Sequence, residues 1–195
     1  MNILITGGTG LIGRALCRAL LAEGHALAVF SRHPETVPDK CGAGVRPRHG
    51  GAEPSGAGVA ASHLLPQTAG FASNVSEVQV LASLDEWTPD RHFDAVINLA
   101  GEPIVDAAWS ERRKQVLRDS RIALTRQLVA HIAQAEQRPA VLLSGSAIGY
   151  YGGRGDQELV ETSGPGDDFP AQLCMDWEAA ALEAEQLGVR VCLLR

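Results

Sequence analysis

Long apolar segments are missing from this chain of 195 residues. A membrane-spanning helix needs about 20 consecutive and mostly apolar residues, and no run in the sequence approaches that length. The N-terminus also lacks a basic region followed by a cleavable apolar stretch, because its apolar residues form a predicted first strand. We therefore expect no membrane partner and a cytoplasmic location.

Cysteine is scarce as well. The sequence has four cysteines without a C-x-x-C pair and six histidines without an H-x-x-H motif. These patterns disfavour zinc sites and disulfide frameworks, so we expect free thiols and no bound metal. The net charge of −6 argues against a nucleic-acid partner.

The N-terminal segment carries the most informative pattern. An apolar, β-prone run at residues 2–6 precedes three glycines at G-x-x-G-x-x-G spacing, and a helical pattern follows at 11–23. In a dinucleotide fingerprint such glycines allow a tight turn, close approach of a pyrophosphate and close helix packing, while the helix N-terminus attracts the phosphates. The alternative is a glycine turn without a ligand. The predicted cofactor-binding residues are Thr6, Gly7, Gly8, Thr9, Gly10, Leu11, Ile12 and Gly13. The predicted apolar face of the helix comprises Ile12, Ala15, Leu16, Ala19 and Leu20.

The end of the next predicted strand, at about 26–31, indicates which dinucleotide binds. NAD-binding units carry an acidic residue there that bonds the ribose 2′-hydroxyl. This chain has Ser31 and Arg32 instead, and a guanidinium can bond a 2′-phosphate bidentately. We expect NADP(H) as the cofactor, with Ser31 and Arg32 in its site. The alternative is a solvated arginine at a strand end.

The remaining chain alternates strands and helices. Further strands are predicted at about 78–81, 95–99, 140–143 and 189–194, and helices at about 110–136 and 168–187, the second capped by Asp168. Such alternation predicts parallel βαβ units. Residues from about 38 to 76 are rich in Gly, Ala, Pro and Ser and lack periodicity, so we predict one domain, 1–195, with an irregular insertion there.

Several motifs together resemble the extended and atypical short-chain dehydrogenase/reductase superfamily. More narrowly, the chain is similar to "epimerase family" proteins, a branch that resembles sugar-nucleotide epimerases. The matching segments are 6–13, 98–104, 120–122, 144–152, 166–169 and 176–181. The resemblance implies an α/β Rossmann-type, doubly wound parallel sheet in strand order 3-2-1-4-5-6, flanked by helices, with an NADP-type cofactor. The family continues beyond this length, so we expect a truncated chain without the C-terminal substrate domain.

The proton-transfer pair of that superfamily is missing. Its Tyr-x-x-x-Lys motif cannot occur here, because the tyrosines are Tyr150 and Tyr151 and the lysines are Lys40 and Lys114. Tyr150 is the best available proton donor, and a pairing with Arg154 is a weak alternative. The resemblance matches Ser146 to the serine that bonds the substrate oxygen, so Ser146 and Tyr150 are the predicted catalytic residues.

Two strand ends complete the predicted cofactor site at the carboxyl edge of the sheet, where ligands of such folds bind. Ser144 is expected near the nicotinamide ribose, although its hydroxyl could instead bond local backbone. Small residues after the fourth strand would let the ribose lie against the backbone. The acidic residue that follows them could accept a hydrogen bond from the ribose, act as a catalytic acid or base, or be a solvated loop residue. The expected residues in this second segment are Asn98, Leu99, Ala100, Gly101 and Glu102.

Three functions remain open at this point. The first is an NADP(H)-dependent oxidoreductase or epimerase-like enzyme acting on an unknown carbonyl or sugar-nucleotide-like substrate. The second is a cofactor-binding module without turnover. The third is a truncated fragment whose apolar last strand, at 189–194, forms an exposed edge and leads to self-association.

Overall fold

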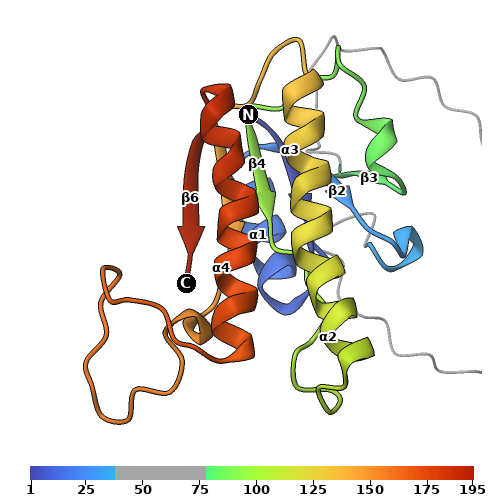
Figure 1. The fold of residues 1–195 in the computed structure, drawn as a ribbon. Helices are drawn as coiled ribbons and strands as arrows, with labels where there is room; N and C mark the ends of the chain where they lie inside the picture. The colour runs from blue at the N-terminus through green and yellow to red at the C-terminus, as the bar shows by residue number, and fades with distance from the viewer. Residues whose placement is uncertain (38–77) are drawn as a thin grey trace, which may run out of the picture.

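Six parallel strands form the central sheet in the computed structural model, which describes residues 1–37 and 78–195. The strands are β1 (Asn2–Thr6), β2 (Ala26–Phe30), β3 (Val78–Leu81), β4 (Ala95–Asn98), β5 (Val141–Gly145) and β6 (Arg190–Leu194). Their spatial order is β3-β2-β1-β4-β5-β6, which confirms the predicted doubly wound, Rossmann-type sheet (Figure 1). The insertion predicted at about 38–76, with Cys41, lies outside the described residues.

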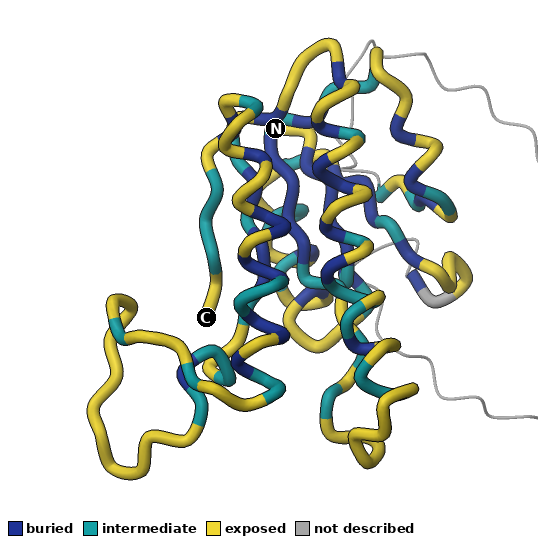
Figure 2. The backbone as a smooth tube through the Cα atoms, viewed as in Figure 1, coloured by how far each residue is buried: buried dark blue, intermediate teal, exposed yellow. Residues whose placement is uncertain are grey.

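Helices cover both faces of the sheet (Figure 1). Side chains alternate along β1, so that Ile3 and Ile5 pack with Cys17 of α1 (Leu11–Ala22) on one face, while Leu4 packs with Leu128 on the other. The second face is covered by α3 (Leu124–Gln134) and α4 (Phe169–Leu182). The buried residues therefore follow the strands between two helical layers (Figure 2).

The apolar face predicted for α1 is partly wrong. Ile12 is exposed, as are Ala15 and Ala19, whereas Gly13 and Cys17 are buried. A Cβ at Gly13 would collide with the carbonyl oxygen of Gly7, so the helix approaches β1 on its glycine side. The close approach of backbone to backbone, and not the apolar periodicity, sets the rotation of α1.

The long helix predicted at about 110–136 is present but not uniform. It consists of α2 (Glu111–Arg118), a π-helical segment at Asp119–Ala123 and α3. Within and beside the π-helical segment, the Ser120 hydroxyl donates to the Leu117 carbonyl at 3.0 Å, and the Thr125 hydroxyl donates to the Arg121 carbonyl at 2.6 Å. Such π-turns are rare and often mark functional sites, and this one faces the cofactor cleft described below.

The fourth helix begins as predicted. The Asp168 carboxylate accepts a hydrogen bond from the Ala171 backbone N–H at 2.9 Å, which caps α4. A 3₁₀ segment, Glu183–Leu187, continues it to Gly188. The helix then leads into β6, the outermost strand on this side of the described sheet. Self-association through β6 stays a prediction.

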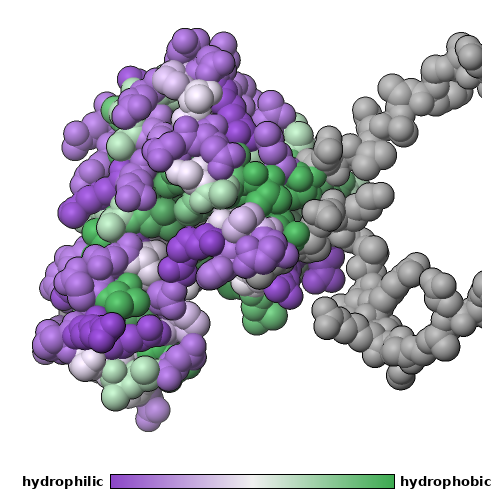
Figure 3. Space-filling model, turned by 90° about the vertical axis from the view of Figure 1, so that its right-hand side faces the viewer, coloured by the Kyte–Doolittle hydropathy of each residue, from purple (hydrophilic) through white to green (hydrophobic). Residues whose placement is uncertain are grey.

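The face of the described residues on the β3 side is mostly hydrophilic, with an apolar band crossing it (Figure 3). None of the helices in this part of the chain combines the length and apolarity needed to cross a membrane. Among the same residues, no three His, Cys, Asp or Glu side chains form a group that could hold a metal ion.

Candidate cofactor site

The glycine turn after β1 has three distinct packing environments. Gly7 adopts a positive φ of 72°, and a Cβ there would lie 2.5 Å from the Leu99 backbone. Gly13 meets the backbone of Gly7 and Gly8. A Cβ at Gly10, by contrast, would meet a single neighbour, the Gly7 carbonyl oxygen at 3.3 Å. Gly7 and Gly13 therefore allow close backbone packing, whereas Gly10 leaves open space above the turn.

Gly10 is also the N-cap of α1. Among the described residues no side chain caps this helix, and its first turn contains no acidic residue. The N–H groups of the first turn and the positive end of the helix dipole are therefore available to an anion.

A cleft of about 560 Å³ opens above this turn at the carboxyl edge of the sheet. It brings together nine of the 16 predicted cofactor-binding residues: Gly7, Thr9, Gly10, Ser31, Arg32, Leu99, Ala100, Gly101 and Glu102. The far wall of the cleft was not predicted from the sequence. It comes from α2, the π-helical segment and α3: Val116, Asp119, Ser120, Ala123, Leu124 and Gln127. The π-helical segment distinguishes this wall in the structure, but its hydrogen bonds leave no mark in the apolar periodicity of the sequence.

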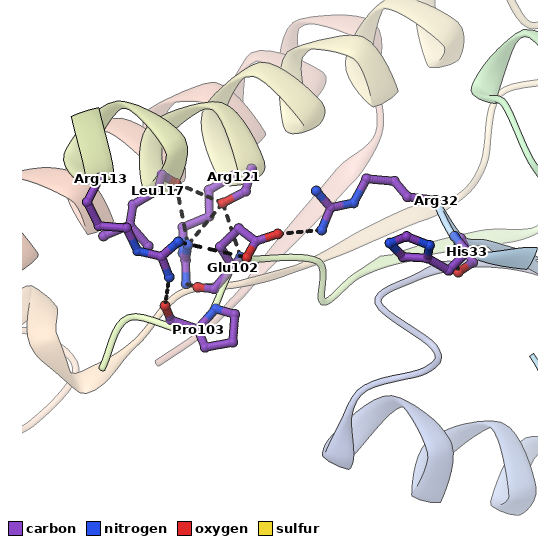
Figure 4. Close-up of polar contacts among 9 residues, drawn as sticks. Arg32, His33, Glu102, Pro103, Arg113, Leu117 and Arg121 are labelled. Atoms are coloured by element: carbon purple, nitrogen blue, oxygen red, sulfur yellow. Dashed lines mark hydrogen bonds and ion pairs between the residues drawn. The ribbon is translucent and has the colours of Figure 1, made fainter. Parts of the chain in front are cut away.

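An ion pair bridges this cleft (Figure 4). The Arg32 guanidinium donates to the Glu102 carboxylate at 2.6 Å, joining the end of β2 to the loop after β4. The hydrogen bond from Arg32 is the main reason that the pKa of Glu102 lies below its usual value, and the charges of Arg32, Arg113 and Arg121 lower the pKa further. Glu102 is therefore ionised at neutral pH.

Two more arginines hold the Glu102 segment in place (Figure 4). Arg121 donates to the Glu102 backbone carbonyl at 2.8 Å, and Arg113 donates to the Pro103 carbonyl and lies 4.0 Å from the Glu102 carboxylate. A Cβ at Gly101 would lie 2.9 Å from the Arg121 guanidinium, so a side chain at this position would displace the arginine. Arg121 of the π-helical segment and Arg113 of α2 therefore hold the loop after β4 in position.

The remaining predicted residues of this group lie beside or beneath the cleft. Thr6 and Asn98 are fully buried, and the Thr6 hydroxyl donates to the Asn98 amide oxygen at 2.7 Å. The Asn98 amide donates to Thr125 at 2.8 Å, and the Trp177 indole donates to the same hydroxyl at 3.0 Å. These side chains connect β1 and β4 to the helices and support the floor of the site.

Three other predicted residues do not line the cleft. Leu11 and Ile12 are exposed on α1, and Ser144 is buried with its hydroxyl donating to the Gly145 carbonyl at 3.3 Å. A Cβ at Gly8 would meet Val29 at 2.8 Å, so this glycine serves packing on β2.

A second cluster lies at the end of β5, around the predicted catalytic residues. The Ser146 hydroxyl donates to Glu178 of α4 at 2.5 Å, and the carboxylate of Glu178 accepts two hydrogen bonds from Arg195, at 2.8 and 2.7 Å. The Arg195 guanidinium lies 3.7 Å from the centroid of the Tyr150 ring. The structure thus places Ser146 and Tyr150 in one cluster with a buried ion pair.

Glu178 and Arg195 were not predicted as site residues from the sequence. Glu178 lies four residues after Cys174 and three before Ala181, and so on the same buried face of the helix. An acidic residue among buried helix positions was the sequence signal that could have identified it. Burial raises the pKa of the nearby Cys174 thiol, so this cysteine is a neutral neighbour and not a thiolate nucleophile. Arg154 donates to the backbone carbonyls of Tyr151, Gly164 and Pro165, and so holds the following loop.

Residues 3–195 match the model of the NAD dependent epimerase/dehydratase family. The chain belongs to this family. An epimerase family protein of Mycobacterium bovis is 36% identical over 196 residues, covering 99% of this chain and 52% of that protein. The chloroplastic SDR39U1 homolog of Arabidopsis thaliana is 34% identical, covering 100% of this chain and 48% of its own length. The chain thus spans about half the length of these curated relatives.

Solved structures agree with this family. The crystal structure of human epimerase family protein SDR39U1 with NADPH superposes with a TM-score of 0.68 at 27% identity, covering 100% of this chain and 53% of the human one. UDP-glucuronic acid 4-epimerase from Bacillus cereus, in complex with NAD, has a TM-score of 0.66 at 18% identity and supports the fold alone. The predicted family and the Rossmann-like nucleotide-binding fold are both confirmed.

Proposed function

We propose that this chain binds NADP(H) and contributes to an oxidoreductase or epimerase reaction on a carbonyl or sugar-nucleotide-like substrate. The observation that carries the proposal is the cleft into which the glycine turn, Arg32 and the loop after β4 converge. The NADPH in the structure of the human relative supports the choice of cofactor.

The residues present fit such a cofactor. The uncapped N-terminus of α1 and the open space above Gly10 suit a pyrophosphate. Arg32 lies at the end of β2, where its two-thirds exposed guanidinium is accessible to a 2′-phosphate. The backbone N–H of His33 donates to the Ser31 hydroxyl at 3.1 Å and so braces the turn that carries Arg32.

The chemistry proposed for the chain centres on Ser146. A bound nicotinamide cofactor accepts or supplies the hydride. The Ser146 hydroxyl donates a hydrogen bond to Glu178, so its oxygen can accept a hydrogen bond from a substrate hydroxyl. In the opposite direction, Ser146 must leave Glu178 before it can donate to a substrate carbonyl. Tyr150 is the proposed proton donor beside it.

Titration calorimetry and turnover assays test the proposal separately. We expect NADPH to bind more tightly than NADH, and we expect oxidation of NADPH by at least one member of a panel of carbonyl compounds and ketosugar nucleotides. Turnover should be lost in Ser146→Ala, while NADPH binding is retained. A chain that binds neither NADPH nor NADH would contradict the proposal.

A cofactor-binding module without turnover is the second candidate. The observation that favours it is the missing Tyr-x-x-x-Lys pair, together with the use of Arg154 in backbone hydrogen bonds. Normal NADPH binding with no turnover across the panel would select this function.

A further inference from the structure

The ion pair across the cofactor cleft joins two strands that are not neighbours. In the sheet, β1 lies between β2 and β4, so Arg32 and Glu102 reach toward each other across the end of β1 and its glycine turn. Arg32 is two-thirds exposed and Glu102 about one-quarter exposed. Exposed ion pairs contribute little to folding stability, so a ligand can open this one at small cost.

The two partners differ in how firmly they are held. The loop of Glu102 is fixed because its backbone N–H donates to Ser120 at 3.1 Å and its carbonyl accepts from Arg121 at 2.8 Å. Arg113, 4.0 Å from the carboxylate, remains near Glu102 if Arg32 moves away. In the described part of the chain, Glu102 is the side chain that holds the Arg32 guanidinium. Arg32 is therefore the partner that can turn toward a ligand, because its guanidinium is held by this one carboxylate.

We propose that Glu102 is a cofactor-selectivity residue, which competes with the 2′-phosphate of NADP(H) for Arg32. The inference rests on the proposed NADP(H) site. An NADP(H) molecule must draw Arg32 from Glu102 and bring its phosphate near a carboxylate of the same charge. An NAD(H) molecule leaves the pair intact. Glu102 thus reduces the preference for NADP(H) that Arg32 alone would give.

Neutralising Glu102 tests this competition directly. NADPH and NADH are titrated calorimetrically into the wild-type chain and into Glu102→Gln. We expect the ratio of the NADH to the NADPH dissociation constant to rise about 1.5- to fivefold in Glu102→Gln, the range for loss of one exposed ion pair, through tighter NADPH binding. Glu111→Gln is the matched control, because Glu111 pairs with Lys114 outside the cleft and its loss changes the net charge equally.

A double-mutant cycle shows whether the effect passes through Arg32. In an Arg32→Ala background, Glu102→Gln should change NADPH affinity less than it does in the wild-type background. An equal change in both backgrounds would overturn competition for Arg32. Glu102→Asp, which withdraws the carboxylate by one methylene, replaces Glu102→Gln if circular dichroism shows that the latter does not fold, and we expect a smaller rise in the ratio.

The outcomes separate this inference from the proposed function. NADPH binding with an unchanged or lowered ratio in Glu102→Gln, or in Glu102→Asp where that variant is used, overturns the selectivity role alone. A wild-type chain that binds neither cofactor overturns the proposed function, and this inference with it.

Discussion

The cofactor cleft and the Ser146 cluster lie at the same edge of the sheet, but they use charge differently. In the cleft, the ion pair of Arg32 with Glu102 is exposed, and a ligand can reach both partners. In the cluster, Glu178 is buried and binds Ser146 and Arg195 with three short hydrogen bonds. The comparison indicates that the cleft pair can exchange partners during binding, whereas the buried pair is part of the framework that positions Ser146.

The largest effect should separate Gly10, which lines the cleft, from Gly13, which packs α1 against the turn. Gly10→Val places a side chain in the open space above the turn, so we expect a folded chain whose NADPH affinity falls by about hundredfold or more. Gly13→Val should instead prevent proper packing of α1, because its Cβ would collide with the Gly7 backbone. Circular dichroism and calorimetry measure both results. Normal NADPH binding by a folded Gly10→Val chain would place the phosphate site elsewhere.

Breaking the buried pair should cost folding stability. Glu178→Ala removes the carboxylate that pairs with Arg195, whose side chain is 19% exposed, and leaves this guanidinium without its ion-pair partner. We expect the free energy of unfolding to fall by about 3 kcal/mol, and Glu178→Gln to cost less because an amide oxygen can still accept from Arg195. Urea denaturation measures both variants. Equal stability of wild type and Glu178→Ala would show that the cluster does not support the fold.

The sequence predicted the cleft better than the cluster for a physical reason. The turn at Gly7, Gly10 and Gly13 is contiguous, so strand, turn and helix can be recognised within one short segment. Ser146 and Glu178 are 32 positions apart, and Arg32 and Glu102 are 70 apart. Such contacts depend on which loops the sheet order brings together. Apolar periodicity located all six strands but not the rotation of α1 or the π-turn, since those depend on backbone packing and local hydrogen bonds.

Removing Arg32 should have an intermediate effect that is confined to one cofactor. We expect Arg32→Ala to weaken NADPH binding by about 1.5–3 kcal/mol, the range for hydrogen bonds to charged groups, and to leave NADH binding nearly unchanged. Calorimetric titration of both cofactors provides the measurement, with Arg126→Ala as a control because Arg126 pairs with Glu183 away from the cleft. An equal loss of NADH affinity would show that Arg32 contacts a part common to both cofactors.

The smallest effect concerns the pH dependence of folding stability. The hydrogen bond from Arg32 holds the pKa of Glu102 below its usual value, so the unfolded chain takes up this proton first as the pH falls. The pair's contribution is therefore fully present above the unfolded pKa of about 4.3 and is lost as the pH falls through the lower pKa of the folded state. Because Arg32 is two-thirds exposed, solvent screening limits the contribution to about 1 kcal/mol or less. Urea denaturation of wild type and Glu102→Gln should show a small difference in unfolding free energy at about pH 7 that shrinks toward about pH 3. A difference that stays constant across this range would mean that Glu102 supports the fold through packing and not through its charge.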